Sequence, residues 1–206
     1  MSCQIKEVDL NRLPPADEIL SERETAFYQT LRFPKRRVEW LGGRFALKEL
    51  VHAQTGAPMR EIEVLPQPAG KPVLRVAGEK SDLAFSITHS QGWALAALSA
   101  EEPFLGIDLE KIEPRLDAWA KDFFHPSELT AGGERFLTAL WTQKEAVVKL
   151  LGTGLCLNSY DVRCIDGKTF FFGPAQAVYA RLGRPRITLQ TSERIAGFMF
   201  TVASGH

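Results

Sequence analysis

The sequence predicts an α+β protein of two similar halves, placed at residues 1–100 and 101–206, each with a small antiparallel sheet packed against one long helix. Short runs of alternating apolar and polar residues, separated by Pro, Gly and Ser, are typical of strands joined by tight turns. Longer amphipathic segments between them indicate helices. One helical segment recurs in the second half of the chain, and this repeat is the observation that divides the chain in two.

The internal repeat aligns Lys48-Glu49 with Lys144-Glu145 at a constant offset of 96 positions. At this offset Phe45 meets Trp141, Val51 meets Val147, Gly56 meets Gly152, and Phe27-Tyr28 meets Phe123-Phe124. Chance is the alternative explanation, because amphipathic helices that end in glycine resemble one another. A true duplication would make the chain a pseudo-twofold pair of halves, each of ordinary small-domain size.

The sequence predicts strands and helices at the following places along the chain. The first strand is expected in "CQIKEVDL", and a helix start after the Pro-rich "LPPADEIL". Residues 35–54 are expected to form a helix that ends at Thr55-Gly56. Two short strands are expected in "EIEVLPQPAGKPVLRV", a hairpin in "LAFSITHSQGWALAALSA" and a strand in "FLGIDLEKI". "FFHPSELTAGGERFLTALWTQKEAVVKLLGTG" should be helical at both ends, and "TFFFGPAQAVYARLGRPRITLQ" and "AGFMFTVASG" should supply closing strands.

The composition narrows the class of protein. The chain is 45% hydrophobic and 24% charged, and its 25 Lys and Arg residues balance 25 Asp and Glu residues. Zero net charge does not favour a protein that coats nucleic acid or an anionic membrane. The N-terminal residues contain no apolar signal core. Cys3, Cys156 and Cys164 form no metal-type pair, and free thiols fit a reducing compartment. We therefore expect a cytoplasmic protein with no nucleic-acid or membrane partner.

The acidic residues of "LGIDLEK" are the first candidates for chemistry. Asp108 and Glu110 are two apart in an expected strand, so both side chains project from one face, while Ile107 and Leu109 face the other way. Two carboxylates on one rigid face suit Mg²⁺, which combines such ligands with waters and phosphate oxygens. The alternative is an exposed edge strand whose acids are solvated and paired with Lys111.

The segment "WTQKEAVVK" supplies further candidates. Glu145 and Lys149 are i,i+4 neighbours on the expected helix, so an ordinary surface ion pair is one interpretation. In the functional interpretation Glu145 is a third acidic ligand or a base, and Lys144 and Lys149 hold phosphate.

Basic residues in the first half are candidate phosphate contacts. Arg37 and Arg44 are seven apart and nearly on one helix face, with Arg36 adjacent, and arginine binds phosphate through two nitrogens. A solvated basic face is the common explanation of such a pattern. His89 ends "FSITHS" and is either a structural residue or a phosphate contact. Lys71 lies in "GKP", which is otherwise a plain turn.

Taken together, these motifs resemble the 4′-phosphopantetheinyl transferase superfamily, whose signature is G-I/V-D followed by W-S/T/A-x-K-E-A/S-x-x-K. Here the signature reads "GID" at residues 106–108 and "WTQKEAVVK" at residues 141–149, with "GKP" and "FSITHS" matching upstream motifs. The resemblance covers residues 35–155, and the last 50 residues carry no matching motif. Chain length and the repeat are similar to the monomeric, surfactin-synthetase-activator type.

The resemblance implies an activity and roles for residues. The phosphopantetheine arm of coenzyme A would move to a serine of an apo acyl or peptidyl carrier protein, leaving adenosine 3′,5′-bisphosphate. Mg²⁺, or Mn²⁺, would be held by three acids: Asp108, Glu110 and Glu145. Glu145 would be a ligand, the serine base, or both, and Lys149 and Lys144 would stabilise phosphate oxygens. The nucleotide contacts implied are Arg36 or Arg37, Arg44, Lys71, His89, and Thr88 in place of the serine of relatives.

Two other interpretations remain open at this point. One is a different metal-dependent phosphoryl enzyme, although the chain contains no "GxxxxGK" loop and no "GxGxxG" loop. The other is a non-catalytic module that binds coenzyme A or a carrier protein. Only one half is expected to be active, because residues 10–14, at offset 96 from residues 106–110, read "LNRLP". The segment "HPSELTAGGERFL" is either a carrier docking loop, with Phe136-Leu137 as apolar contacts, or a plain connection.

Overall fold

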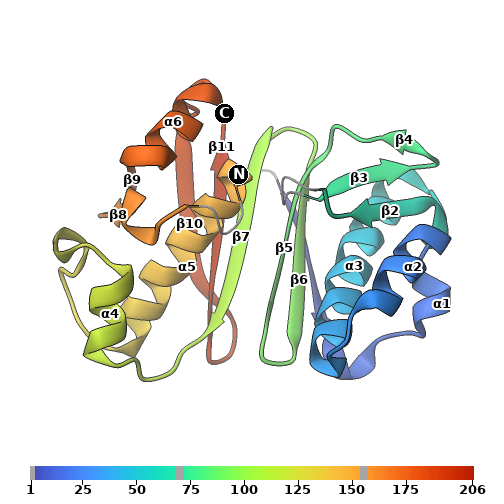
Figure 1. Cartoon of the computed structure of the whole chain (residues 1–206), viewed down its shortest axis with the longest axis horizontal. Helices are drawn as coiled ribbons and strands as arrows, with labels where there is room; N and C mark the ends of the chain where they lie inside the picture. The colour runs from blue at the N-terminus through green and yellow to red at the C-terminus, as the bar shows by residue number, and fades with distance from the viewer. Residues whose placement is uncertain (1–2, 68–71, 154–156) are drawn as a thin grey trace. The chain divides into compact units, whose positions relative to one another are not determined.

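The computed structural model describes residues 3–67, 72–153 and 157–206, and the chain divides into two compact units, Met1–Glu101 and Glu102–His206 (Figure 1). We call them the N-terminal and C-terminal units. Each combines small antiparallel sheets with helices, so the expected α+β class is confirmed.

The N-terminal unit is built around one long helix. Its helices are α1 (Ala16–Ile19), α2 (Glu22–Thr30) and α3 (Pro34–Thr55), with 3-10 turns at Leu10–Arg12 and Met59–Glu61. Its strands are β1 (Gln4–Asp9), β2 (Ile62–Leu65), β3 (Val73–Val76), β4 (Glu79–Lys80), β5 (Ala84–Ser90) and β6 (Trp93–Ser99). They form two antiparallel sheets, in the orders β1-β6-β5 and β2-β3-β4.

Helix α3 packs closely against the first of these sheets. Two glycines make the close approach possible. A Cβ at Gly42 would lie 2.1 Å from Leu10 Cδ2 in the 3-10 turn and 3.2 Å from Ala94 Cβ on β6, and one at Gly43 would lie 2.6 Å from Ile87 Cγ2 on β5. The helix ends at Gly56, whose φ of 73° provides the left-handed C-terminal turn that glycine adopts without strain. The expected helix over residues 35–54 is therefore confirmed, with each end extended by one residue.

The C-terminal unit repeats this plan with another long helix. Its helices are α4 (Asp117–Phe123), α5 (Glu134–Leu151) and α6 (Gly173–Arg181), with 3-10 turns at Pro126–Glu128 and Ser159–Asp161. Its strands are β7 (Phe104–Lys111), β8 (Val162–Ile165), β9 (Lys168–Phe171), β10 (Ile187–Ile195) and β11 (Phe198–Gly205). The sheet orders are β10-β11-β7 and β8-β9, all antiparallel.

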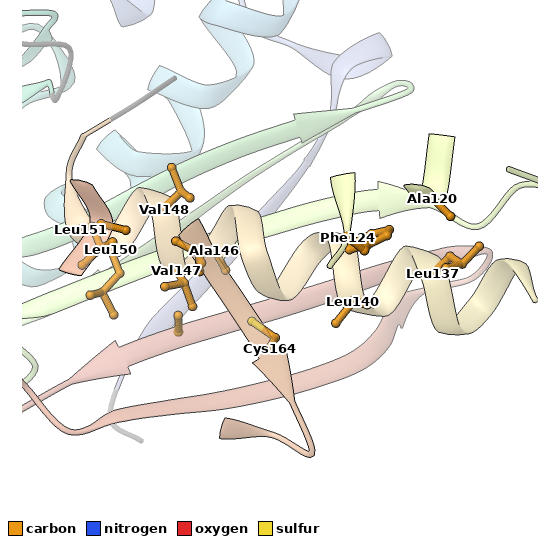
Figure 2. Close-up of a cluster of buried hydrophobic side chains, with 13 residues drawn as sticks. Ala120, Phe124, Leu137, Leu140, Ala146, Val147, Val148, Leu150, Leu151 and Cys164 are labelled. Carbon is orange, nitrogen blue, oxygen red and sulfur yellow. The ribbon is translucent and has the colours of Figure 1, made fainter. Parts of the chain in front are cut away.

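The core of the C-terminal unit follows the inner face of α5. Figure 2 shows its apolar side chains along that helix, from Leu137 and Leu140 to Leu150 and Leu151, with Cys164 on β8 beside them. Strand β11 comes from the last 50 residues, where no motif was recognised, and it pairs with β7 along the whole length of that strand. The last 50 residues, through β11, therefore hold β7, the strand that carries Asp108 and Glu110, in the sheet.

The sequence prediction was wrong for part of the segment after residue 168. We expected closing strands from Thr169 to Gln190, but Gly173–Arg181 forms helix α6 between β9 and β10. Pro174 stands in the first turn, where its missing N–H costs nothing, and it is followed by helix-forming Ala and Gln residues.

The segment "HPSELTAGGERFL", for which a docking loop and a plain connection were both open, is partly buried. Glu128 is buried, Leu137 belongs to the core of the unit, and Phe136 packs against that core. This segment therefore serves as an internal connection at these positions.

No helix in the described part of the chain combines the length and the apolar character needed to cross a membrane.

Candidate active site

The glycine of the "GID" motif brings strand β7 and helix α5 into direct contact. A Cβ at Gly106 would lie 2.0 Å from the backbone oxygen of Ala146 and 2.5 Å from the backbone nitrogen of Leu150. Only glycine leaves room for the helix backbone at this distance. Because side chains alternate along a strand, Asp108 and Glu110 project from the same face toward α5.

Asp108 and Lys149 join the strand to the helix. Asp108 is 5% exposed, and its Oδ1 accepts a hydrogen bond of 2.8 Å from Lys149 Nζ. The sequence left open a simple pair of Glu145 with Lys149 along the helix surface. In the structure Lys149 instead reaches across to β7, and its charge only opposes the rise in the pKa of Glu145 that burial and Asp108 cause.

Glu110 is held by two residues that sequence reasoning did not select for the site. Trp141 Nε1 donates a hydrogen bond of 3.3 Å to Glu110 Oε1, and Arg115 Nη2 lies 3.8 Å from Glu110 Oε2. Arg115 in turn stacks on Trp119, with its guanidinium carbon 4.6 Å from the ring centroid. The signature motif contained a signal for Trp141, since an indole can only donate a hydrogen bond and so needs an acceptor nearby.

The three acids influence one another electrostatically. Burial, followed by the negative charge of Asp108, raises the pKa of Glu110 to about 7, while Arg115, Trp141 and Lys149 oppose the rise. The same two causes raise the pKa of Glu145. Asp108 is thus close enough to both glutamates to disfavour their ionised forms, which is the electrostatic setting that a bound cation would relieve.

The donor set fits a hard divalent cation by its chemistry. All three candidates are carboxylates, the ligands that Mg²⁺ prefers. As the side chains stand, no group of three or more His, Cys, Asp or Glu residues in the described ranges closes around a single metal position.

The structure places Lys144 differently from the expectation of a phosphate contact. Lys144 is 1% exposed, and its Nζ donates to both carboxylate oxygens of Glu128 at 2.9 and 2.7 Å. Burial of the ammonium lowers the pKa of Lys144, while Glu128 opposes this. The ammonium of Lys144 therefore neutralises a buried carboxylate inside the unit. Lys149 is the lysine of the motif that contacts an acid of the site, Asp108.

In the N-terminal unit, the structure brings Arg36 and His89 together. Arg36 Nη1 lies 3.0 Å from His89 Nε2, and Glu39 Oε2 lies 3.7 Å from His89 Nδ1. Arg36 and Glu39 belong to the first turns of α3, and His89 lies near the end of β5. Sequence reasoning did not single out Glu39.

The other arginine candidates have partners within the N-terminal unit. Arg37 Nε donates to the backbone oxygen of Leu31 at 2.6 Å, so Arg36, not Arg37, lies against His89. Arg44 stacks over Trp40 at 4.1 Å and donates to the backbone oxygen of Val64 at 3.4 Å. Burial lowers the pKa of Arg44 to about 10, against the opposing effect of Glu24, and the charge of Arg36 lowers it further.

Thr88 and Lys71 complete the set of predicted residues. Thr88 is buried and precedes His89 on β5, so the two side chains face opposite sides of the strand. The side chain of Thr88 therefore lies on the other face of β5 from that of His89. Lys71 lies outside the described residues.

Three carboxylates and a lysine at one helix–strand contact are typical of metal-dependent phosphoryl-transfer sites. The sequence model of the 4′-phosphopantetheinyl transferase superfamily matches residues 104–193, which include β7 and α5. A holo-(acyl-carrier-protein) synthase of Geobacillus sp. is 34% identical over 91 residues, covering 41% of this chain and 76% of that protein. The chain belongs to this superfamily.

Longer relatives are matched over part of their length. The 4′-phosphopantetheinyl transferase HetI of Nostoc sp. is 31% identical over 145 residues, covering 66% of this chain and 61% of that protein. The chain thus spans about three-fifths of the length of this curated relative. A holo-(acyl-carrier-protein) synthase from Bacillus anthracis, solved in complex with CoA, matches with a TM-score of 0.39 and 28% identity, covering 47% of this chain and 91% of that chain.

Proposed function

We propose that the protein transfers the 4′-phosphopantetheine group of coenzyme A to a serine hydroxyl of an apo acyl or peptidyl carrier protein, releasing adenosine 3′,5′-bisphosphate. The observation that carries the proposal is the contact made through Gly106, which sets Asp108 and Lys149 2.8 Å apart within the segment that the superfamily model matches.

The acids and Lys149 have separate roles in this proposal. Asp108, Glu110 and Glu145 would hold Mg²⁺ or Mn²⁺. A divalent cation at these carboxylates would neutralise the charge of the pyrophosphate. Lys149 donates a hydrogen bond to Asp108, so its ammonium lies beside the acids. From there it would stabilise the negative charge on phosphate oxygens.

We propose that Glu145 is the base that accepts the proton of the serine hydroxyl. Lys149 donates a hydrogen bond to Asp108, and Trp141 donates one to Glu110, which fixes these two carboxylates in place. Glu145 lies on α5, close enough for the charges of Asp108 and Lys149 to act on its carboxylate. A carboxylate within hydrogen-bond reach of the hydroxyl can accept its proton as the serine oxygen attacks phosphorus.

We further propose that Arg36 and His89 contact the nucleotide of coenzyme A, with Lys71 in the same role. The proposal is supported by the 3.0 Å contact between Arg36 Nη1 and His89 Nε2, because both side chain types can bind phosphate. Arg44 contributes positive charge near Arg36. We also propose that the chain acts as a monomer in the cytoplasm, in keeping with the monomeric type that it resembles and with the free thiols of Cys3 and Cys164.

The test is a transfer assay with coenzyme A, Mg²⁺ and several apo carrier proteins, read by intact-protein mass spectrometry. A carrier that gains the mass of one phosphopantetheine arm supports the proposal, and the same carrier with its serine replaced by alanine is the control. Removal of the divalent cation with EDTA should stop the transfer, and Mg²⁺ or Mn²⁺ should restore it. No transfer to any carrier would overturn the proposal and leave a binding module as the function.

A further inference from the structure

Charged side chains from the first turns of α3 lie on two sides of His89, whose own side chain is 32% exposed. Its Nε2 faces Arg36 Nη1 at 3.0 Å, and its Nδ1 faces Glu39 Oε2 at 3.7 Å. Glu39 is only 15% exposed at its side chain, and Lys35 Nζ lies 3.8 Å from its other oxygen. The imidazole therefore has an anion on one side and a cation on the other.

This geometry fixes which nitrogen of His89 carries the proton. A guanidinium can only donate, so Nε2 must accept from Arg36 and carry no hydrogen. The remaining proton lies on Nδ1, on the side of the Glu39 carboxylate. In this state His89 is neutral, and Nε2 has no hydrogen to offer to a phosphate oxygen.

Helix α3 and strand β6 both pack against β5. Helix α3 supplies Lys35, Arg36 and Glu39, whereas strand β6, the other neighbour of β5, contains only apolar residues and Ser99. Arg37 is turned to the backbone of Leu31. Glu39 is thus the carboxylate of α3 that faces the imidazole.

We propose that Glu39 is a positioning residue for His89, and that a phosphate group binds at Arg36 and His89 together with one proton. In this step the hydrogen bond from Arg36 to Nε2 breaks, Nε2 takes a proton from solvent, and Nε2–H and Arg36 both donate to phosphate oxygens. The Glu39 carboxylate then stabilises the imidazolium through Nδ1–H. The inference rests on the proposed function, because it takes the nucleotide phosphate as the ligand.

The experiment measures binding rather than transfer. Isothermal titration of adenosine 3′,5′-bisphosphate into the protein at pH 8, in two buffers of different ionisation enthalpy, counts the protons taken up. We expect about one proton per nucleotide for the wild-type protein and none for His89→Gln. Glu39→Gln should weaken binding roughly two- to fivefold at pH 8, the range measured for partly exposed ion pairs, and less at pH 6, where protons are abundant.

A matched control is available on the same helix. Glu49→Gln also removes one carboxylate from α3, but its partner is Lys6 at 2.9 Å, so affinity and proton count should stay at wild-type values. A purely structural role of Glu39 would not make the loss of affinity depend on pH.

The outcomes separate this inference from the proposed function. If the wild-type protein transfers phosphopantetheine and binds the nucleotide without proton uptake, the inference is wrong and the function stands. The same holds if His89→Gln keeps the proton uptake, or if Glu39→Gln binds as tightly as wild type at pH 8. If the wild-type protein neither binds the nucleotide nor transfers phosphopantetheine, both proposals fall.

Discussion

Each unit holds its long helix with an equivalent buried lysine–glutamate pair, but the strand facing that helix presents Asp108 in the C-terminal unit and Lys6 in the N-terminal unit. In the N-terminal unit Lys48, on α3, donates to Glu24 Oε2, and Glu24 also accepts from the backbone nitrogens of Ser21 and Val64 at 3.1 and 2.9 Å. Both charged side chains are fully buried. One carboxylate thereby ties the helix, a turn and strand β2 together.

The C-terminal unit repeats this arrangement with different residues. Glu128 accepts from Lys144 on α5, and from the backbone nitrogens of His125 and Cys164 at 2.8 and 2.9 Å. Strand β8 takes the place of β2. The lysine that the two "KE" pairs share is therefore part of the scaffold in both units.

The units differ at one strand position that faces the helix. Lys6 pairs with Ala96, the fourth residue of β6, and Asp108 pairs with Thr201, the fourth residue of β11, so the two positions are equivalent. Lys6 forms an ion pair of 2.9 Å with Glu49 of α3. Asp108 instead adds a second negative charge beside Glu145, so the same scaffold carries a neutralised pair in one unit and an acidic site in the other.

The largest expected effect is on stability, through the shared ion pair. Lys144→Met leaves the buried Glu128 carboxylate without its cation and should reduce the free energy of unfolding by about 3–5 kcal/mol. Urea denaturation followed by far-UV circular dichroism measures it. Lys48→Met should cost a similar amount in the N-terminal unit. A loss below about 1 kcal/mol for both variants would show that these pairs do not stabilise the units.

The next effect is on activity and separates the two units. Asp108→Ala should reduce the transfer rate by at least about 100-fold, the effect typical of removing one group that stabilises transition-state charge. Lys6→Ala changes the equivalent position of the other unit and should leave the rate close to wild type. Both are measured by the mass of the carrier protein over time. Equal rates for wild type and Asp108→Ala would remove Asp108 from the site.

The comparison also explains what the sequence could and could not predict. Long elements with clear periodicity, such as α3, and the position of the acids on β7 followed from spacing alone. The role of Lys144 did not, because its partner Glu128 is 16 residues away and a buried lysine in a motif looks like a functional one.

The offset of 96 aligns equivalent positions of the two long helices, but it does not align the segments that precede them. The offset of 96 joins Glu49 to Glu145, but the strand equivalent to β7 is β1, not residues 10–14. Likewise, Phe27-Tyr28 follow Glu24, whereas Phe123-Phe124 precede Glu128, so the aromatic match was a coincidence. Insertions change the offset between elements, and a single fixed spacing cannot follow them.

A smaller effect is expected from the glycines that allow close packing. Gly106→Ala places a methyl group against the backbone of α5, which cannot move by itself, and should destabilise the protein by about 1–3 kcal/mol and slow transfer. Gly43→Ala would place a Cβ 2.6 Å from Ile87 Cγ2, a side-chain atom that can shift more easily than a helix backbone, and alanine favours the helix by about 1 kcal/mol, so the loss should be smaller than for Gly106→Ala. Thermal denaturation compares them, and equal losses in Tm would contradict this difference.

The smallest expected effect is the pH dependence that Glu110 adds to stability. The pKa of Glu110 is raised to about 7 in the folded protein by burial and by Asp108. Between its ordinary value and 7 the folded state therefore keeps a proton that the unfolded chain has released, and stability falls as the pH rises through this range. The contribution should be on the order of 1 kcal/mol, because solvent screens this partly exposed carboxylate.

Urea denaturation of metal-free protein at pH 5 and pH 8 isolates this contribution when wild type is compared with Glu110→Gln. The raised pKa of Glu145 acts in the same direction in both proteins and cancels in the difference. Wild type should lose more stability than the variant on going to pH 8, and added Mg²⁺ should recover more of it there. Identical losses would show that Glu110 ionises as easily in the folded protein as in the unfolded chain.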